Sequence, residues 1–314
     1  MNQLKKYITF SIIVFCFGTM PTFAQRVWSN PVGQYAYNPS GACYNDLGEL
    51  LVSYYNTYAS ANNSPQGALL MGSTSLPTDN MGVGFKFVYE KGGVLSNLMA
   101  EATYVYKVNL GNNHKLGLGL SGTFQQTALQ DHLVNAQHPD DRYLMLGAES
   151  DYWFDVNFGL SFYKPNHYFI GIAAYNLVGQ HTSWMLPNFE GRTSRLLTVS
   201  GLYDFFFLQG DIKLELAAEA MMYVPFDKFS LVYDVTAKLQ WRKYCWIGGG
   251  YTNNIAKIMA GVYIQNFAIG YAGGIGVGEI SNFAYAFPQH EVFLRLEFNT
   301  SKWSKRQRNN MEQK

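Results

Sequence analysis

The chain has 314 residues, of which 48% are hydrophobic and only 14% are charged, against about 25% in ordinary domains. Its net charge of +1 excludes the basic footprint of a nucleic-acid-binding protein. A helical membrane span is excluded as well, because mean hydropathy is −0.10 and no apolar run is long enough.

The first 24 residues read as a signal peptide. Two lysines precede an apolar stretch at 7–18 that is too short to span a bilayer. Thr22 and Ala24 fit the small-residue rule for cleavage, so the mature chain is expected to begin at Gln25. An uncleaved anchor is the alternative. The pattern predicts export.

Cleavage would remove Cys16 and leave Cys43 and Cys245 in the mature chain. These two cysteines could pair in an oxidising compartment or stay as free thiols. Their spacing does not suggest a metal site, so no metal and no cofactor is predicted.

Residues 25–48 form the next unit, an irregular segment with two Asn-Pro pairs and several glycines. This composition is typical of an extended or looped lead-in. We expect a periplasmic N-terminal segment or plug here. Asn38 and Pro39 are the hypothetical seat of this segment in the mouth of a barrel.

The region 97–125 sets the pattern for the rest of the chain. Apolar and polar residues alternate along 97–110, a Gly-Asn-Asn turn follows at 111–113, and the alternation returns along 115–125. Period two is the strand period, and Gly and Asn suit tight hairpin turns. Each arm is long enough to cross a bilayer as a tilted strand.

The same period recurs along the chain. The expected strands are 49–59, 66–73, 83–90, 97–110, 115–125, 152–162, 167–177, 192–207, 212–224, 231–242, 245–252, 256–264, 266–274 and 291–298. Three long segments, 128–151, 178–191 and 275–288, lack the period and are expected to be loops.

A soluble sandwich and a membrane barrel both alternate, but they differ in how their loops are sorted. With a periplasmic N-terminus, the three long loops all fall outside. The turns at 111–113, 163–165, 208–210 and 242–244 fall inside and are all short, which is the rule for outer-membrane barrels. The sequence therefore predicts an all-β protein, a transmembrane antiparallel up-and-down β-barrel of about fourteen strands over residues 49–300.

The mature chain resembles the PorP/SprF family of type IX secretion system membrane proteins. Four stretches carry the resemblance: the motif at 35–42, the glycine-marked strand from Gly82 to Gly93, the hairpin from Tyr104 to Leu120, and the final strand at 290–294. Ser40 stands where the family usually has Ala, and a basic tail follows the last strand.

The resemblance implies a non-enzymatic outer-membrane barrel that docks or anchors a secreted, adhesin-like surface protein in secretion or gliding. It also implies contacts with secretion-system components. The family-motif residues that could touch a partner are Tyr37, Asn38, Pro39, Gly41, His290 and Glu291. The outer loops are the expected recognition surface. The alternative is an outer-membrane transport channel for small solutes or apolar ligands.

Two groups of residues suggest other chemistry. His132, His138, Asp140 and Asp141 are suitable metal ligands, but their spacing matches no known site, which favours a solvated surface loop. His181 and Ser183 match the His–Ser spacing of a lipid-modifying barrel enzyme, although no orienting acid follows.

Charged residues of both signs are expected on the lumen face: Glu101, Lys107, Lys115, Asp155, Lys213, Glu215, Glu219, Asp234, Lys238, Arg295 and Glu297. A selective pore is one interpretation. Mixed sign favours the other, in which the charges pair and fill the interior.

The tail at 301–314 has a net charge of +4. It is either a solvated end or a contact for a peptidoglycan-associated periplasmic protein.

Overall fold

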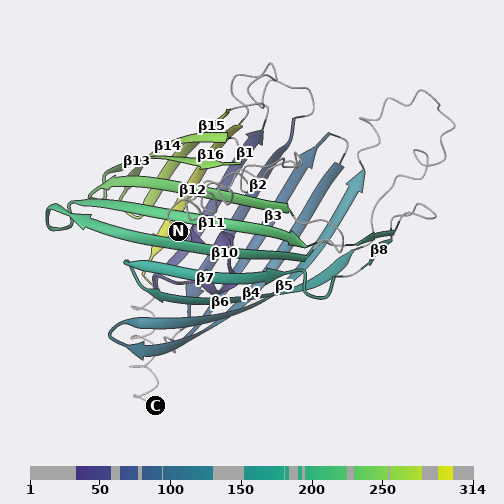
Figure 1. Ribbon diagram of the computed structural model, residues 1–314, viewed down its shortest axis with the longest axis horizontal. Helices are drawn as coiled ribbons and strands as arrows, with labels where there is room; N and C mark the ends of the chain where they lie inside the picture. Colours follow the sequence, from purple (N-terminus) through teal and green to yellow (C-terminus); the bar gives the residue numbers. More distant parts are fainter. Residues whose placement is uncertain are drawn as a thin grey trace, which may run out of the picture.

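Fourteen strands close into one antiparallel barrel in the computed structural model (Figure 1). The structure describes residues 33–57, 64–76, 80–93, 95–129, 152–179, 181–183, 190–192, 195–224, 230–253, 255–277 and 289–299. The barrel strands are β1 (Gly48–Thr57), β2 (Gln66–Ser75), β3 (Met81–Gly92), β4 (Leu95–Gly111), β5 (His114–Leu129), β6 (Trp153–Lys164), β7 (Tyr168–Tyr175), β10 (Arg195–Phe207), β11 (Ile212–Val224), β12 (Ser230–Trp241), β13 (Cys245–Thr252), β14 (Ile255–Ile264), β15 (Phe267–Gly276) and β16 (Gln289–Phe298).

Each barrel strand pairs with the barrel strands before and after it in the chain, and β1 pairs with β16 to close the wall. Two three-residue strands, β8 (His181–Ser183) and β9 (Glu190–Arg192), form a separate ribbon, so β7 pairs directly with β10. The predicted fold class is confirmed. Among the described residues, no helix has the length and apolar character to cross a bilayer.

The connections sort by length between the two ends of the barrel. At one end, here called the short-turn end, no connection exceeds the five residues between β2 and β3. The three long predicted loops leave from the other end, here called the loop end. In Figure 1 the tight turns lie at the left and β8 lies at the right. This is the sorting that the sequence predicts for a membrane barrel.

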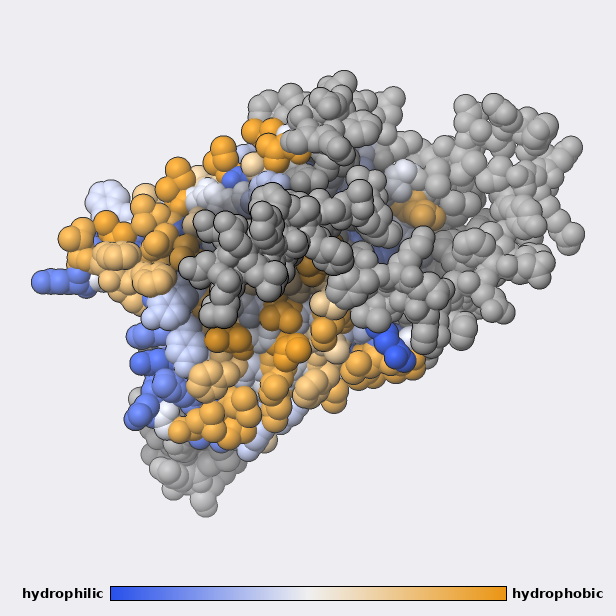
Figure 2. All heavy atoms as spheres, viewed as in Figure 1, coloured by the Kyte–Doolittle hydropathy of each residue, from blue (hydrophilic) through white to orange (hydrophobic). Residues whose placement is uncertain are grey.

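The two faces of the wall carry opposite kinds of side chain. Large apolar residues point outward: on the isolated chain Phe87 is 48% exposed, Tyr104 42% and Ile170 59%. Figure 2 shows a broad hydrophobic band on the outer surface, with hydrophilic residues gathered at the short-turn end. Between them, Glu101 and Lys107 point into the lumen and are 4% and 0% exposed. The apolar face therefore meets lipid and the polar face lines the interior.

Several strand boundaries differ from the sequence prediction. β4 begins at Leu95, and β10 begins at Arg195 because Arg192 pairs with His181 in the ribbon. Strands of three residues leave no readable period, which is why the ribbon was predicted as loop.

Candidate functional site

Residues 33–47, here called the plug segment, run inside the barrel. They form two short 3-10 helices, η2 (Gln34–Ala36) and η3 (Pro39–Gly41), and lead directly into β1. Gly33, at the start of the described chain, lies beside the Glu49 side chain near the beginning of β1. Both ends of the plug segment therefore lie at the short-turn end, and the segment is a re-entrant loop.

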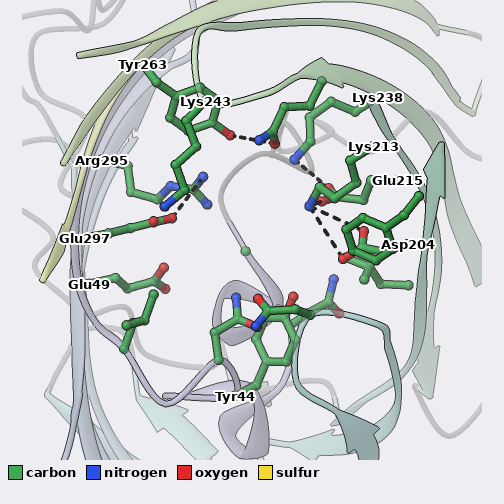
Figure 3. Close-up of a pocket in the computed structure, with 18 residues that line it drawn as sticks. Tyr44, Glu49, Asp204, Lys213, Glu215, Lys238, Lys243, Tyr263, Arg295 and Glu297 are labelled. Carbon is green, nitrogen blue, oxygen red and sulfur yellow. Dashed lines mark hydrogen bonds and ion pairs between the residues drawn. The ribbon is translucent and has the colours of Figure 1, made fainter. Parts of the chain in front are cut away.

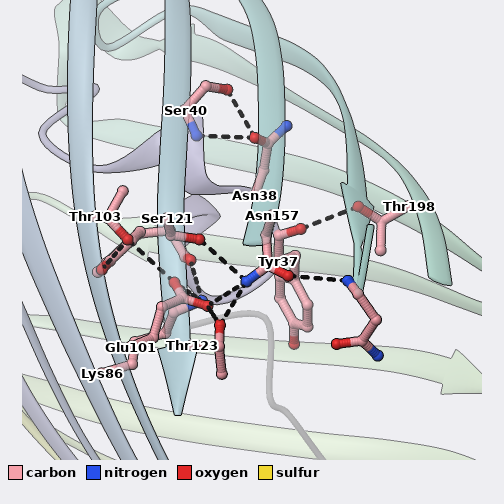
Figure 4. Close-up of polar contacts among 12 residues, drawn as sticks. Tyr37, Asn38, Ser40, Lys86, Glu101, Thr103, Ser121, Thr123, Asn157 and Thr198 are labelled. Carbon is pink, nitrogen blue, oxygen red and sulfur yellow. Dashed lines mark hydrogen bonds and ion pairs between the residues drawn. The ribbon is translucent and has the colours of Figure 1, made fainter. Parts of the chain in front are cut away.

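Local sequence makes the turn at the top of this loop. Asn38 is the N-cap of η3, and its Oδ1 accepts hydrogen bonds from the backbone N of Ser40 at 2.9 Å and from Ser40 Oγ at 2.7 Å. Pro39 follows at the first helical position, where its missing N–H costs nothing and its fixed φ suits the helix. Figure 4 shows Asn38 and Ser40 against the barrel wall.

A floor of glycines lets this turn approach the wall. Gly119 in β5, Gly159 in β6 and Gly171 in β7 face the lumen under Asn38, Pro39 and Ser40. A Cβ atom on any of them would lie under 3.0 Å from an atom of Asn38 or Ser40. Glycine is thus required here for close approach rather than for an unusual backbone angle. The Asn38 Nδ2 also donates to the carbonyl of Leu160 at 3.4 Å.

The first leg of the plug segment is held through Tyr35. Its hydroxyl donates to Thr103 Oγ1 at 2.9 Å, and its carbonyl accepts from Lys86 Nζ at 3.4 Å. The Lys86 ammonium lies 4.9 Å from the Tyr35 ring centroid and 2.8 Å from Glu101 Oε1. Glu101 in turn accepts a hydrogen bond from Asn157 (Figure 4).

The second leg is held by buried lysines. Lys107 Nζ donates to the carbonyl of Cys43 at 2.9 Å, to Asp46 Oδ1 at 2.8 Å and to Ser75 Oγ at 2.9 Å. Lys115 also pairs with Asp46. Burial raises the pKa of the Cys43 thiol, which the nearby Lys107 charge only partly offsets. Cys43 and Cys245 are both free thiols, so they do not pair in this structure.

Most other lumen charges pair with one another, within a strand or between strands, as the second interpretation of the sequence expects. The ion pairs are Lys86–Glu101, Lys213–Asp204, Lys213–Glu215, Lys238–Glu215, Lys257–Asp234 and Arg295–Glu297. Lys86, Asp204 and Lys257 belong to this set although sequence reasoning did not single them out. The alternation that identified the others places them on the same face.

A cavity of about 260 Å³, here called the mouth cavity, opens at the short-turn end beside the plug segment (Figure 3). Gly33, Tyr44 and Asn45 of the plug segment form part of its lining. The wall contributes charged residues from β1, β10, β11, β12 and β16. Its chemistry is therefore polar and ionic.

The structure separates the six predicted motif residues into two places. Tyr37, Asn38, Pro39 and Gly41 lie in the plug segment, deeper than the predicted mouth, and Thr198 Oγ1 donates to the Tyr37 carbonyl at 3.0 Å. Glu291 also faces the lumen, where Ser53 Oγ donates to it at 2.6 Å. His290 instead faces outward and contacts the Tyr271 hydroxyl at 2.6 Å, because neighbouring strand residues alternate in direction.

Some predictions fall on residues that the structure does not describe. The signal peptide, the His132–Asp141 candidates and the tail beyond residue 299 lie outside the described residues. His181 and Ser183 lie in β8, but their side chains are not described. Among the residues that are described, no cluster of His, Cys, Asp or Glu could hold a metal ion.

The chain matches the model of a known protein family. The model of the PorP/SprF family, described as type IX secretion system membrane protein, matches residues 32–296. A comparison with curated proteins gives no match.

Solved structures with similar folds are outer-membrane barrels. A mutant of the TodX monoaromatic hydrocarbon channel has 9% identity and a TM-score of 0.51, covering 84% of this chain and 93% of that one. A FadL homologue from Pseudomonas aeruginosa has 8% identity and a TM-score of 0.50, covering 89% and 99%. At such identities the likeness concerns the fold alone.

Proposed function

Because the chain belongs to the PorP/SprF family of type IX secretion system membrane proteins, we propose that it is a non-enzymatic outer-membrane anchor for a secreted surface protein. Membership of the family already implies an outer-membrane barrel associated with type IX secretion. The docking role goes further, and two features support it: the structure of the interior and the structure of the loop end.

The plug segment is the observation that carries the proposal. It lies across the lumen, and buried lysines, a capped turn and a glycine floor hold it on three sides. The lumen charges that remain are mostly paired with one another. An interior of this kind favours a rigid scaffold over a path for solutes, because selective pores tend to present unpaired charge of one sign.

The loop end supports a recognition role. Asp155 in β6 accepts hydrogen bonds from the backbone N–H groups of Val178 and Gly179 at 2.9 and 3.2 Å. Asn157 similarly accepts from the backbone N of Asn176 at 3.0 Å. These bonds fix the base of the predicted loop 178–191 to the barrel wall. Loops on a rigid scaffold are the usual place for partner recognition.

The orientation follows from export and loop sorting. A chain cleaved before Gln25 and inserted from the periplasm would leave its short-turn end in the periplasm and its loop end outside the cell. The predicted partner, a secreted type IX cargo protein, would then meet loops 128–151, 178–191 and 275–288.

The test is a gentle-detergent pull-down of the tagged barrel from native outer membranes. We expect a large secreted protein or type IX components to co-purify at near-stoichiometric amounts. The Asp155→Ala variant should recover less of the secreted protein, because it releases the base of one loop, whereas Lys243→Met at the short-turn end should recover as much as wild type. A barrel that purifies alone and conducts ions in planar bilayers would instead favour the transport channel.

A further inference from the structure

The mouth cavity carries a balanced but incompletely paired set of charges. Four cations and four anions line it: Lys213, Lys238, Lys243 and Arg295, and Glu49, Asp204, Glu215 and Glu297. On the wall formed by β10, β11 and β12, Lys213 lies 3.4 Å from Asp204 and 3.0 Å from Glu215, and Lys238 lies 2.6 Å from Glu215. This side is neutral and self-contained.

The rest of the charged lining has one ion pair and two charges left over. Arg295 and Glu297 of β16 pair at 3.4 Å. Glu49 of β1 and Lys243 of the β12–β13 turn line the same cavity, but neither makes an ion pair or side-chain hydrogen bond among the described residues. Figure 3 shows both side chains directed into the cavity. The buried Asn45 Oδ1, on the plug segment, is a further acceptor without a hydrogen-bond partner.

We propose that the mouth cavity binds a zwitterionic amino-acid group, with its ammonium against Glu49 and Asn45 and its carboxylate against Lys243. A carboxylate and an amide oxygen are the acceptors that an ammonium needs, and a lysine supplies the donors for a carboxylate. A singly charged ligand would leave one of the two unpaired groups unused. The zwitterion satisfies both and keeps the cavity neutral.

This inference goes beyond the proposed function, because the site lies at the end opposite the recognition loops. In the proposed orientation it opens to the periplasm. Two sources there carry the same chemistry: a free amino acid, and the diamino-acid residue of a cell-wall stem peptide, whose side-chain end bears both an ammonium and a carboxylate. The shared group is the proposal, and the experiment separates the sources.

The experiment titrates the detergent-purified full-length barrel with meso-diaminopimelate by calorimetry. It then uses the derivative acetylated on both amino groups and the derivative amidated on both carboxylates, so that neither end of the molecule keeps the blocked group. Each derivative should bind about tenfold more weakly, because each lacks one charge-assisted hydrogen-bonding group. Glu49→Gln should weaken binding of the parent compound by a similar factor, and in this variant N-acetylation of the ligand should cause no further loss of affinity. Lys243→Met should also weaken binding of the parent compound, and in that variant amidation of the ligand should cause no further loss.

Lys164→Met is the matched control, since Lys164 ends β6 at the same end of the barrel but does not line the cavity. It should bind like wild type. A soluble muropeptide that binds more tightly than free diaminopimelate would identify the wall as the source, and the reverse order would identify the free amino acid.

Equal affinity for the parent compound and both derivatives, or no binding by a wild-type barrel that keeps its heat-modifiable mobility, would overturn the proposal. The pull-down of secreted partner by Glu49→Gln reports separately on the docking role.

Discussion

The absence of a side chain at Gly159 allows the plug segment to lie against the barrel wall. A Cβ at this position would lie under 3.0 Å from Asn38 Oδ1 and from the backbone N of Ser40. Gly159→Ala should therefore push the plug segment off the wall, at a cost of about 1–3 kcal/mol for overpacking. Because the change leaves the β6 backbone pairing intact, the barrel itself should still form.

Maleimide labelling of Cys43 in a Cys245→Ser background measures this release. Gly122→Ala is the matched control, because Gly122 in β5 has nothing within 4 Å of its Cβ position. We expect rapid labelling for Gly159→Ala and slow labelling for the control. Equally slow labelling in both would show that the wall can accommodate the added methyl group.

The pH dependence of the same reaction is a second prediction. The thiolate is the reactive form, and burial raises the pKa of Cys43, so less thiolate exists at any given pH than in an exposed cysteine. Labelling of wild type should accelerate only as the pH rises beyond about 8.5, the ordinary cysteine value. In Gly159→Ala the acceleration should begin at lower pH. A wild-type profile like that of a free thiol would contradict the buried position.

Of the contact between the plug segment and the glycines of the wall, the sequence identified only the residues of the plug segment. Asn38 and Pro39 stand out as a motif, and an N-cap followed by proline is readable locally. Gly119, Gly159 and Gly171 were not singled out as a seat. Their meeting depends on the register of three strands, β5, β6 and β7, and glycines on a lumen face are common in barrel strands for other reasons.

Among the secondary elements, β4 forms hydrogen bonds with both legs of the plug segment, through Thr103 and Lys107. Lys107 in the middle of this strand is fully buried and donates to the carbonyl of Cys43, to Asp46 and to Ser75. Lys107→Met would remove the donor to Ser75 Oγ and one of the two donors to the Cys43 carbonyl, which still accepts from the backbone N of Asp46. Asp46 itself keeps Lys115 and partial exposure to water. We expect roughly 1–3 kcal/mol less stability of the plugged state.

Urea titration followed by Cys43 labelling would measure that loss. Lys115→Met serves as the comparison, because Lys115 contacts only the half-exposed Asp46 and should cost less than about 1 kcal/mol. If the two variants release the segment at the same urea concentration, the buried contacts of Lys107 are not what retains it.

The strands and the order in which they pair were both largely predictable, because an up-and-down barrel pairs consecutive strands. Period two is strong along β11 and β12, where leucine, alanine and charged residues alternate over a dozen positions. The pairing of β7 with β10 follows the predicted strand order, but the β8–β9 ribbon between them was not predicted. Strands of three residues carry too little alternation to be recognised.

The whole molecule is a barrel whose lumen is occupied by its own N-terminal segment. Fold class and loop sorting are global consequences of alternation, so the sequence was sufficient for both. The re-entrant path of residues 33–47 was only partly foreseen, as a plug or lead-in. Nothing local in those residues specifies how deep they reach, since depth is set by the lysines and glycines of strands that follow much later.

Deleting residues 34–44 should convert the barrel into an open pore. The deletion removes η2, η3 and the contacts of Tyr35, Asn38 and Cys43, but keeps Asp46 with its two lysines at the short-turn end. In planar bilayers wild type should conduct little, and the deletion should give large, stable openings. These openings should discriminate weakly between K⁺ and Cl⁻, because the wall that they expose carries charges of both signs. Gly122→Ala should remain as closed as wild type. Large openings already in wild type would mean that the plug segment leaves a continuous path, and the scaffold role would lose its main support.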